Sequence, residues 1–198
     1  KDLEQCVASA LKTDYVNIYS RFLPTLLSQD VPNLKSLING NHRVRPKAYT
    51  CTFSEVFSNF STRVFAKDRQ WGRMLFRDYI QLRYETGMWH QTWRLGRSVP
   101  VRSCCTPVCK LADINVDTLG VKEPPRNWTS TMDHSKWSIS IPGGSAEKVV
   151  CISDLNHVAS QAHRGGGAVC FTSSEIWQAL RSTIRRVESC PLSPRAYE

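Results

Sequence analysis

The sequence predicts an α/β fold: a mixed sheet with flanking helices, stapled by disulfide bonds. Short apolar runs of strand length alternate with stretches whose apolar residues recur every three or four positions, the spacing of one helix face. The 198 residues are 41% hydrophobic and 22% charged, which is enough apolar sequence for one sizeable core. We therefore expect residues 1–198 to form a single domain.

The first half of the chain alternates between the two patterns. Two stretches predict helices, Tyr15–Leu27 and Trp71–Leu82, because their apolar residues fall near helical spacing. Three stretches predict strands, because β-branched and aromatic residues alternate in them: Thr50–Phe57, Ser61–Ala66 and Met88–Leu95.

The second half continues the alternation after a linker-like stretch, Val121–Ser130, which we expect to be an exposed loop. The short apolar runs Val149–Ile152 and Ala168–Phe171 predict strands. Thr172-x-x-Glu175 has the form of a capping box and predicts the start of a helix. The expected apolar stripe of that helix is Ile176, Leu180, Ile184 and Val187. The order of the strands is not predicted.

Cysteines and sequons indicate the secretory pathway. The eight cysteines lack the C-x-x-C spacing of a zinc site, so we expect disulfides and no metal site: Cys6, Cys51, Cys104, Cys105, Cys109, Cys151, Cys170 and Cys190. Asn59 and Asn127 are N-x-S/T glycosylation acceptors. The chain opens at Lys1 without an apolar leader, so we expect a processed product. All apolar runs fall below the ~20 residues of a membrane span.

A formal net charge of +9 favours contact with a polyanion, because lysine and arginine neutralise phosphate and attract it over long range. Charge alone leaves several interpretations open: nucleic acid, heparin-like glycans, an anionic membrane surface, or solubility.

The segment Asp133-His134-Ser135-Lys136-Trp137 contains the motif H-x-K. In an extended strand residues two apart point to the same side, so we expect the imidazole and the ammonium to face one ligand. The pair suits a phosphodiester, because a histidine can attack phosphorus or protonate the leaving oxygen while lysine binds a non-bridging oxygen. Alone the motif is weak, and an exposed histidine beside a solvated lysine is the plainer interpretation.

The second element is the stretch from Cys151 through Asn156 to Arg164-Gly165-Gly166-Gly167 and Cys170. Consecutive glycines permit positive φ angles that bring N–H groups close to an anion, and Arg164 is a ready phosphate ligand. The alternative is a tight turn closed by a Cys151–Cys170 bridge, and both can hold together.

In order and approximate spacing, three strings resemble the C-terminal region of deoxyribonuclease II: Asp133-His134-Ser135-Lys136-Trp137, Cys151-Ile152-Ser153-Asp154-Leu155-Asn156, and Arg164-Gly165-Gly166-Gly167 with Cys170. Weaker similarities extend the resemblance over most of the chain: Val31-Pro32-Asn33-Leu34, Gly40-Asn41-His42, Phe65-Ala66-Lys67, Trp89-His90-Gln91-Thr92 and Pro194-Arg195-Ala196-Tyr197.

The resemblance implies a fold like that of the phospholipase D superfamily, in which two α/β halves each give one H-x-K to a shared site. Members of the family cut DNA at acidic pH without a divalent metal or other cofactor and leave 3′-phosphate ends. Acidic operation is reasonable, because one histidine must be neutral and one protonated, and imidazole titrates near ~6.5. The implied partner is DNA, and the implied location is outside the cell or in the lysosomal lumen.

The resemblance also assigns roles. It makes His134 and Lys136 the second H-x-K, with His134 as the general acid, and Asn156 an orienting or phosphate-binding group. Trp137 is expected to be a packing residue. The implied disulfides join Cys151 to Cys170, and Cys190 to one of Cys104, Cys105 and Cys109.

The sequence departs from the family in one respect, because it holds a single H-x-K. The other histidines lack a lysine two positions on: His42, His90, His157 and His163. Three explanations remain: a second chain supplies the N-terminal half, which we favour; two copies form a homodimer; or the protein binds without cutting. We expect His90 to be a packed strand histidine.

Two functions compete with an acid endodeoxyribonuclease. One is a secreted, catalytically silent relative that binds DNA or another polyanion, and the other is a structural disulfide-rich glycoprotein. Salt-sensitive binding of DNA without cleavage distinguishes the first, and failure to bind DNA at low salt favours the second.

Overall fold

A computed structural model describes residues 2–14, 31–40, 47–54 and 61–190. Its helical segments are α1 (Asp2–Asp14), α2 (Pro32–Ile38), η1 (Arg69–Trp71), η2 (Phe76–Ile80), α3 (Gln81–Tyr84), η3 (Ser130–Met132), η4 (Ala159–His163) and α4 (Ser174–Thr183). Its strands are β1 (Ala48–Ser54), β2 (Ser61–Lys67), β3 (Met88–Gln91), β4 (Asp113–Val121), β5 (Arg126–Thr129), β6 (Trp137–Ser140), β7 (Val149–Ser153), β8 (Gly166–Thr172) and β9 (Ile184–Val187).

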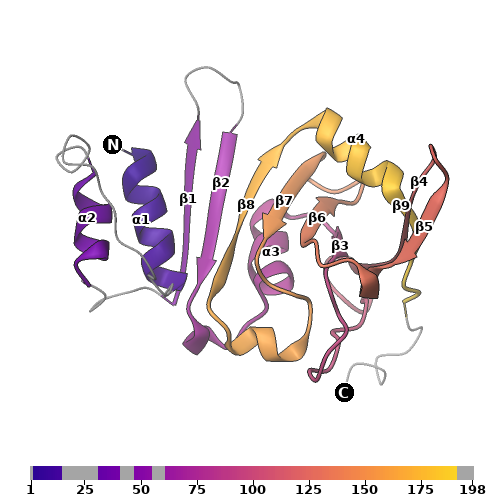
Figure 1. The fold of residues 1–198 in the computed structure, drawn as a ribbon, viewed down its shortest axis with the longest axis horizontal. Helices are drawn as coiled ribbons and strands as arrows, with labels where there is room; N and C mark the ends of the chain where they lie inside the picture. The colour runs from indigo at the N-terminus through magenta and orange to yellow at the C-terminus, as the bar shows by residue number, and fades with distance from the viewer. Residues whose placement is uncertain (1, 15–30, 41–46, 55–60, 191–198) are drawn as a thin grey trace.

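The strands form one mixed sheet in the order β1-β2-β8-β7-β6-β3-β4-β5, and β9 pairs with β4. Every pair is antiparallel except β3 with β4. Figure 1 shows α1 and α2 beside the β1 end of the sheet and α4 over its other half. The α/β fold with a mixed sheet and flanking helices is therefore confirmed.

Each face of the sheet has its own apolar cluster, because side chains alternate between the faces along a strand. In β7, Val149 and Cys151 point to one face, where Phe76 and Ile80 of η2 cover them. Val150 points to the other face, where Trp177 of α4 packs. Helical segments therefore pack on both faces of the central strands. This packing holds in place the strand ends from which the loops after β3 and β7 and before β6 extend.

Four disulfides pair the eight cysteines: Cys6–Cys51, Cys104–Cys109, Cys105–Cys190 and Cys151–Cys170. The bridge between Cys151 and Cys170 links β7 to β8, where the two residues are direct register partners. Cys190 pairs with Cys105, one of the three partners that the resemblance leaves open.

Several expected elements have different bounds. The helix expected over Trp71–Leu82 is interrupted at its start. Gly72 adopts a left-handed conformation with φ 69° and ends η1, so the continuous helical segment begins at Phe76 with η2. The strand expected over Met88–Leu95 ends at Gln91. The loop expected over Val121–Ser130 instead contains β5, which pairs with β4. The helix expected over Tyr15–Leu27 lies outside the described residues.

The last helix differs at both ends from the expected one. Its N-cap is Ser173, not Thr172, and the Ser173 hydroxyl accepts a hydrogen bond from the Ile176 N–H. The helix ends at Thr183, so Ile184 and Val187 belong to β9 rather than to a helical stripe. Pairing with β4 overrides the helical spacing there.

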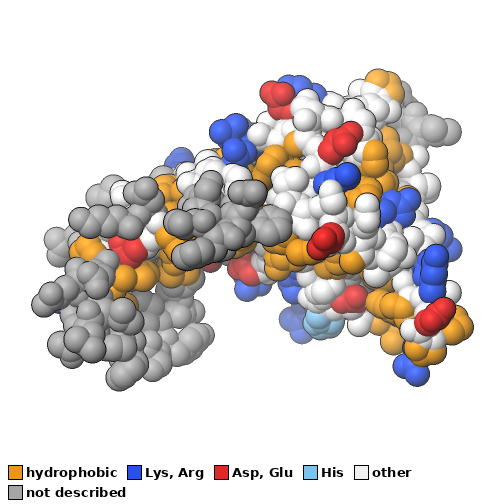
Figure 2. All heavy atoms as spheres, turned by 90° about the horizontal axis from the view of Figure 1, so that it is seen from above, with side chains coloured by type: hydrophobic (Ala, Val, Ile, Leu, Met, Phe, Trp, Pro, Cys, Tyr) orange, Lys and Arg blue, Asp and Glu red, His pale blue; other side chains and the backbone are white. Residues whose placement is uncertain are grey.

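No helix among the described residues has the length and apolar character needed to cross a bilayer. On the face seen in Figure 2, the lysine and arginine side chains are spread among aspartate and glutamate rather than gathered in one patch. On this face, therefore, the positive charge marks no single binding surface.

Candidate functional site

The H-x-K segment lies immediately before β6, not inside a strand as expected. Asp133 shapes it: one carboxylate oxygen accepts a hydrogen bond from the Ser135 N–H at 2.8 Å, and the other accepts from Trp128 Nε1 at 3.0 Å. Burial alone would raise the pKa of Asp133, but these hydrogen bonds outweigh it and the pKa lies below its usual value. Asp133, which has no role in the sequence analysis, therefore fixes the turn that presents His134.

His134 is exposed and packs against an aromatic ring. Its imidazole lies 4.7 Å from the ring of Trp93, centroid to centroid, with a 33° angle between the planes. Trp93 is held in turn by a 3.0 Å hydrogen bond from its Nε1 atom to the Thr131 carbonyl. Gln91, at the end of β3, donates to the Asp133 carbonyl. The end of β3 thus supports the H-x-K segment on one side.

Lys136 is half-buried, and its ammonium donates a 2.8 Å hydrogen bond to the carbonyl of His134. Its own carbonyl accepts from the Ser153 N–H at the end of β7. The two residues of the motif are therefore held together by a local contact rather than by strand alternation. Lys136 also connects the motif directly to the loop that carries Asn156.

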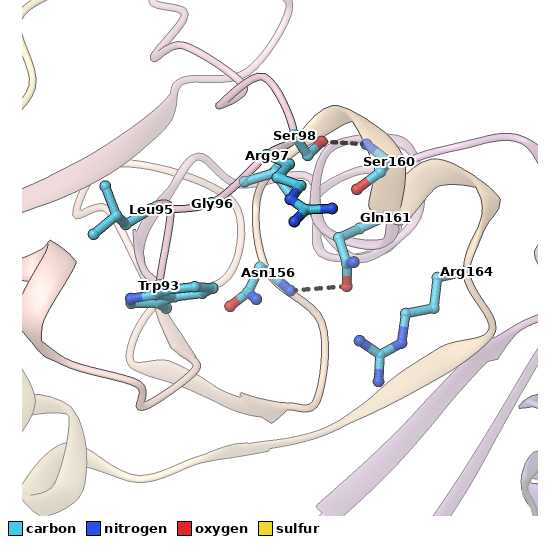
Figure 3. Close-up of a pocket in the computed structure, with 10 residues that line it drawn as sticks. Trp93, Leu95, Gly96, Arg97, Ser98, Asn156, Ser160, Gln161 and Arg164 are labelled. Carbon is cyan, nitrogen blue, oxygen red and sulfur yellow. Dashed lines mark hydrogen bonds between the residues drawn. The ribbon is translucent and has the colours of Figure 1, made fainter.

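Asn156 lines a cavity of about 470 Å³. The side-chain oxygen of Asn156 is buried without a hydrogen-bond partner among the described residues, an arrangement that usually marks a missing ligand or water. The cavity is lined by Trp93, Leu95, Gly96, Arg97, Ser98, Asn156, Val158, Ser160, Gln161 and Arg164. Figure 3 shows the Arg97 and Arg164 guanidinium groups and the Asn156 amide around the same hollow.

The structure therefore brings some of the predicted site residues together. Asn156 and Arg164 line one cavity, and His134 packs on Trp93, which forms part of the cavity wall. His134 and Lys136 do not themselves line the cavity. Trp93 and Arg97 also line the cavity, although no sequence pattern identifies them as site residues.

The glycine triplet does not have the expected conformation. None of Gly165, Gly166 and Gly167 has a positive φ angle, so they form no anion-binding turn of that kind. They are packing positions: a Cβ atom on Gly165 would lie 2.2 Å from the Asp14 carbonyl oxygen, and one on Gly167 would lie 2.4 Å from the Phe65 carbonyl oxygen. The expectation of positive φ is wrong, because close approach of α1 and β2 is what excludes side chains here.

The remaining histidines are placed as follows. His90, in β3, is completely buried, so it is a packed strand histidine as predicted. His157 is also completely buried, and burial above all lowers its pKa to about 3. His163 is exposed at the end of η4. Of the two sequons, Asn127 is exposed in β5, and Asn59 lies outside the described residues.

A family model described as Deoxyribonuclease II matches residues 2–190. The chain belongs to the deoxyribonuclease II family. It is 26% identical to Plancitoxin-1 of Acanthaster planci over 93% of this chain and 50% of that protein. It is 30% identical to Deoxyribonuclease-2 of Caenorhabditis elegans over 88% of this chain and 44% of that protein. It is 24% identical to Deoxyribonuclease-2-alpha of Rattus norvegicus over 93% of this chain and 51% of that protein.

This deoxyribonuclease II family chain thus spans about half the length of these relatives.

Proposed function

We propose that this chain is the C-terminal half of a metal-independent acid endodeoxyribonuclease and supplies one of its two H-x-K half-sites. The observation that carries the proposal is the position of His134 and Lys136 beside a cavity lined by Asn156 and Arg164, in a chain of the deoxyribonuclease II family. Histidine, lysine, arginine and amide groups are the set that binds and polarises a phosphodiester without a metal ion.

The proposed reaction has two steps. In the first, the histidine of the other half-site attacks phosphorus; a nitrogen–phosphorus bond forms, the bond from phosphorus to the 5′-oxygen breaks, and protonated His134 gives its proton to that oxygen. In the second, water attacks phosphorus, the nitrogen–phosphorus bond breaks, and neutral His134 takes a proton from the water. The products are a 5′-hydroxyl end and a 3′-phosphate end.

The surrounding groups have distinct proposed roles. Lys136 stabilises the charge on a non-bridging oxygen in the transition state, and Arg164 binds a phosphate of the DNA strand with its planar guanidinium. The free carbonyl oxygen of Asn156 orients a proton donor, either the substrate water or the other histidine. Gly165 and Gly166 serve this site only by allowing the chain that carries Arg164 to pack closely.

The second H-x-K has to come from another polypeptide segment or another copy of the chain, because only one H-x-K occurs in the sequence. We propose that a second polypeptide, corresponding to the N-terminal half of the relatives, completes the site. A homodimer is the alternative, and the mass of the native particle distinguishes the two. Four disulfides and the acidic chemistry fit an extracellular or lysosomal location.

The decisive experiment is nicking of supercoiled plasmid DNA at about pH 5 in excess chelator by the completed particle. We expect His134→Ala to lower the rate about 10²–10⁴-fold, the usual contribution of a positioned acid or base. His163→Ala is the matched control, because this histidine is exposed but does not line the cavity. A folded, complete particle that fails to nick DNA overturns the proposal.

A second function is favoured by the presence of a single H-x-K: a catalytically silent relative that binds DNA or another polyanion. It predicts salt-sensitive retention of DNA without cleavage at any pH, and retention that His134→Ala leaves unchanged.

A further inference from the structure

We infer that the cavity beside Asn156 binds the phosphate that neighbours the cleaved one along the same DNA strand, and that Arg97 is a phosphate-binding residue there. The inference rests on the proposed function, because it assigns a subsite of the same site. The inference is carried by the convergence of two arginine side chains and an aromatic wall on one hollow.

Neither arginine that lines the cavity forms an ion pair with a carboxylate of the described residues, a property that Arg126 on β5 shares. Arg77, Arg94 and Arg186 each form an ion pair with an aspartate or glutamate. Within the described ranges, Arg97 and Arg164 form none, although Arg164 interacts at longer range with Asp14. Two guanidinium groups facing one cavity repel each other, and an anion placed between them relieves that repulsion and accepts their hydrogen bonds.

The cavity is built by two segments that are held in fixed register. The Ser160 N–H donates to the Ser98 hydroxyl at 2.9 Å, and the Ala159 N–H donates to the Val99 carbonyl at 2.8 Å. The Val101 N–H donates to the His157 carbonyl at 3.1 Å. Arg97 and Arg164 flank these paired segments, so the backbone positions from which the two side chains extend are fixed before a ligand arrives.

The size and walls of the cavity suit one nucleotide unit. A volume of about 470 Å³ falls within the range of roughly 300–1,000 Å³ that is usual for small-molecule sites. Trp93 forms part of the cavity wall, the His134 imidazole packs on its ring, and its Nε1 atom donates a hydrogen bond to the Thr131 carbonyl. Because these two contacts hold Trp93, it acts as a fixed wall rather than as a platform for a base.

The test measures how DNA affinity depends on salt, in a His134→Ala background so that the strand stays intact. Binding of a fluorescein-labelled oligothymidylate is followed by anisotropy between about 50 and about 200 mM NaCl. We expect Arg97→Ala to weaken binding about tenfold at the lower salt. We also expect it to reduce the slope of log Kobs against log salt by about 0.7, the value for one lost phosphate contact on a single strand.

Two variants make the result specific. Arg126→Ala removes the same charge from an exposed position on β5 and should leave the slope within error. Arg97→Lys keeps the charge and should recover most of the slope but not all of the affinity. Equal slopes for Arg97→Ala and Arg126→Ala, or no binding at low salt, overturn the inference.

The outcomes also separate this inference from the proposed function. Plasmid nicking by the complete particle together with equal slopes contradicts the Arg97 subsite alone. An Arg97-dependent slope in a particle that never nicks DNA contradicts the nuclease proposal and leaves the phosphate subsite standing.

Discussion

The Nε2 atom of His90 lies 2.7 Å from the Oδ1 atom of Asp113, and both side chains are completely buried. The other carboxylate oxygen of Asp113 faces Arg77 at 2.5 Å and His157 Nε2 at 3.4 Å. On its far side, His90 Nδ1 is 2.7 Å from the Ser138 hydroxyl. One buried carboxylate therefore organises polar groups from several segments of the chain.

These segments are the ones that carry the proposed site. His90 is in β3, which leads to Trp93, and Ser138 is in β6, which follows the H-x-K segment. His157 is adjacent to Asn156, and its Nδ1 atom donates a 2.9 Å hydrogen bond to the side-chain oxygen of Asn115. The buried polar groups around Asp113 therefore connect β3, β6 and the segment of His157, which are the three segments that carry the proposed site residues.

The first prediction concerns the charge of Asp113. Burial would raise the pKa of Asp113, but His157, His90 and Arg77 outweigh burial and hold the pKa well below its usual range. Asp113→Ala leaves buried partners without an acceptor, so we expect the free energy of unfolding to fall by about 3–5 kcal/mol in urea denaturation. Asp117→Ala on the same strand breaks an exposed pair with Arg186 and should cost at most about 1 kcal/mol. Equal losses in the two variants would contradict a special role for the buried carboxylate.

The second prediction is a pH dependence of stability that comes from His157. Burial is the main cause that lowers its folded pKa to about 3, and His90, Arg77 and Arg94 act in the same direction while Asp113 opposes them. An unfolded histidine takes up a proton near ~6.5, so between these values the unfolded chain binds more protons and stability falls as the pH drops. From about pH 6 to about pH 4.5 we expect a loss of about 2 kcal/mol from this residue.

The measurement is urea unfolding across that pH range for the wild type and for His157→Gln, which removes the titrating ring. Burial above all raises the pKa of Asp14 to about 6, so this residue contributes with the opposite sign in part of the same range. For that reason the difference between the two proteins, rather than either curve alone, isolates His157. A variant that loses stability on acidification as steeply as the wild type would refute the assignment.

Much of the sheet can be predicted from sequence because β7 and β8 contribute side chains to the apolar clusters on both faces, and such strands consist of short apolar runs. Val149–Ile152 and Ala168–Phe171 lie inside β7 and β8, and Ser61–Ala66 lies inside β2. Buried His90 is recognisable from its position between two tryptophans. Strand β4 is not recognisable, because Asp113 and Asn115 are polar residues whose burial depends on partners that are distant in sequence.

The site could be predicted only in part. The H-x-K motif identifies His134 and Lys136, but strand alternation fails as the reason that they lie together, since Lys136 folds back onto the His134 carbonyl. Nothing in the sequence separates Arg97 from the other arginines, because its place in the cavity depends on hydrogen bonds between residues 98–101 and 157–160. Long-range pairing of this kind leaves no local pattern.

The third prediction concerns the support of His134 by Trp93. Removing the ring in Trp93→Ala leaves the imidazole without its packing partner, so we expect a fall in kcat of about tenfold or more with little change in melting temperature. Trp93→Phe keeps an aromatic face but loses the hydrogen bond to the Thr131 carbonyl, and should retain most of the activity. An alanine variant with unchanged kcat would show that the stacking does not position His134.

The fourth prediction tests whether the glycine triplet is a packing device. A Cβ on Gly165 would lie 2.2 Å from the Asp14 carbonyl oxygen, which is backbone and cannot move aside, so Gly165→Ala should cost about 1–3 kcal/mol of stability. Gly143→Ala is the control: its φ of 92° is unfavourable for alanine, but no atom lies within 4 Å of the new carbon, so only about 1 kcal/mol is expected. If the triplet served mainly to bind phosphate, Gly165→Ala would weaken DNA binding while unfolding at the same urea concentration as the wild type. If the close contact with α1 is the reason for the glycine, Gly165→Ala should lose more stability than Gly143→Ala. Its folded fraction should still bind DNA as the wild type does.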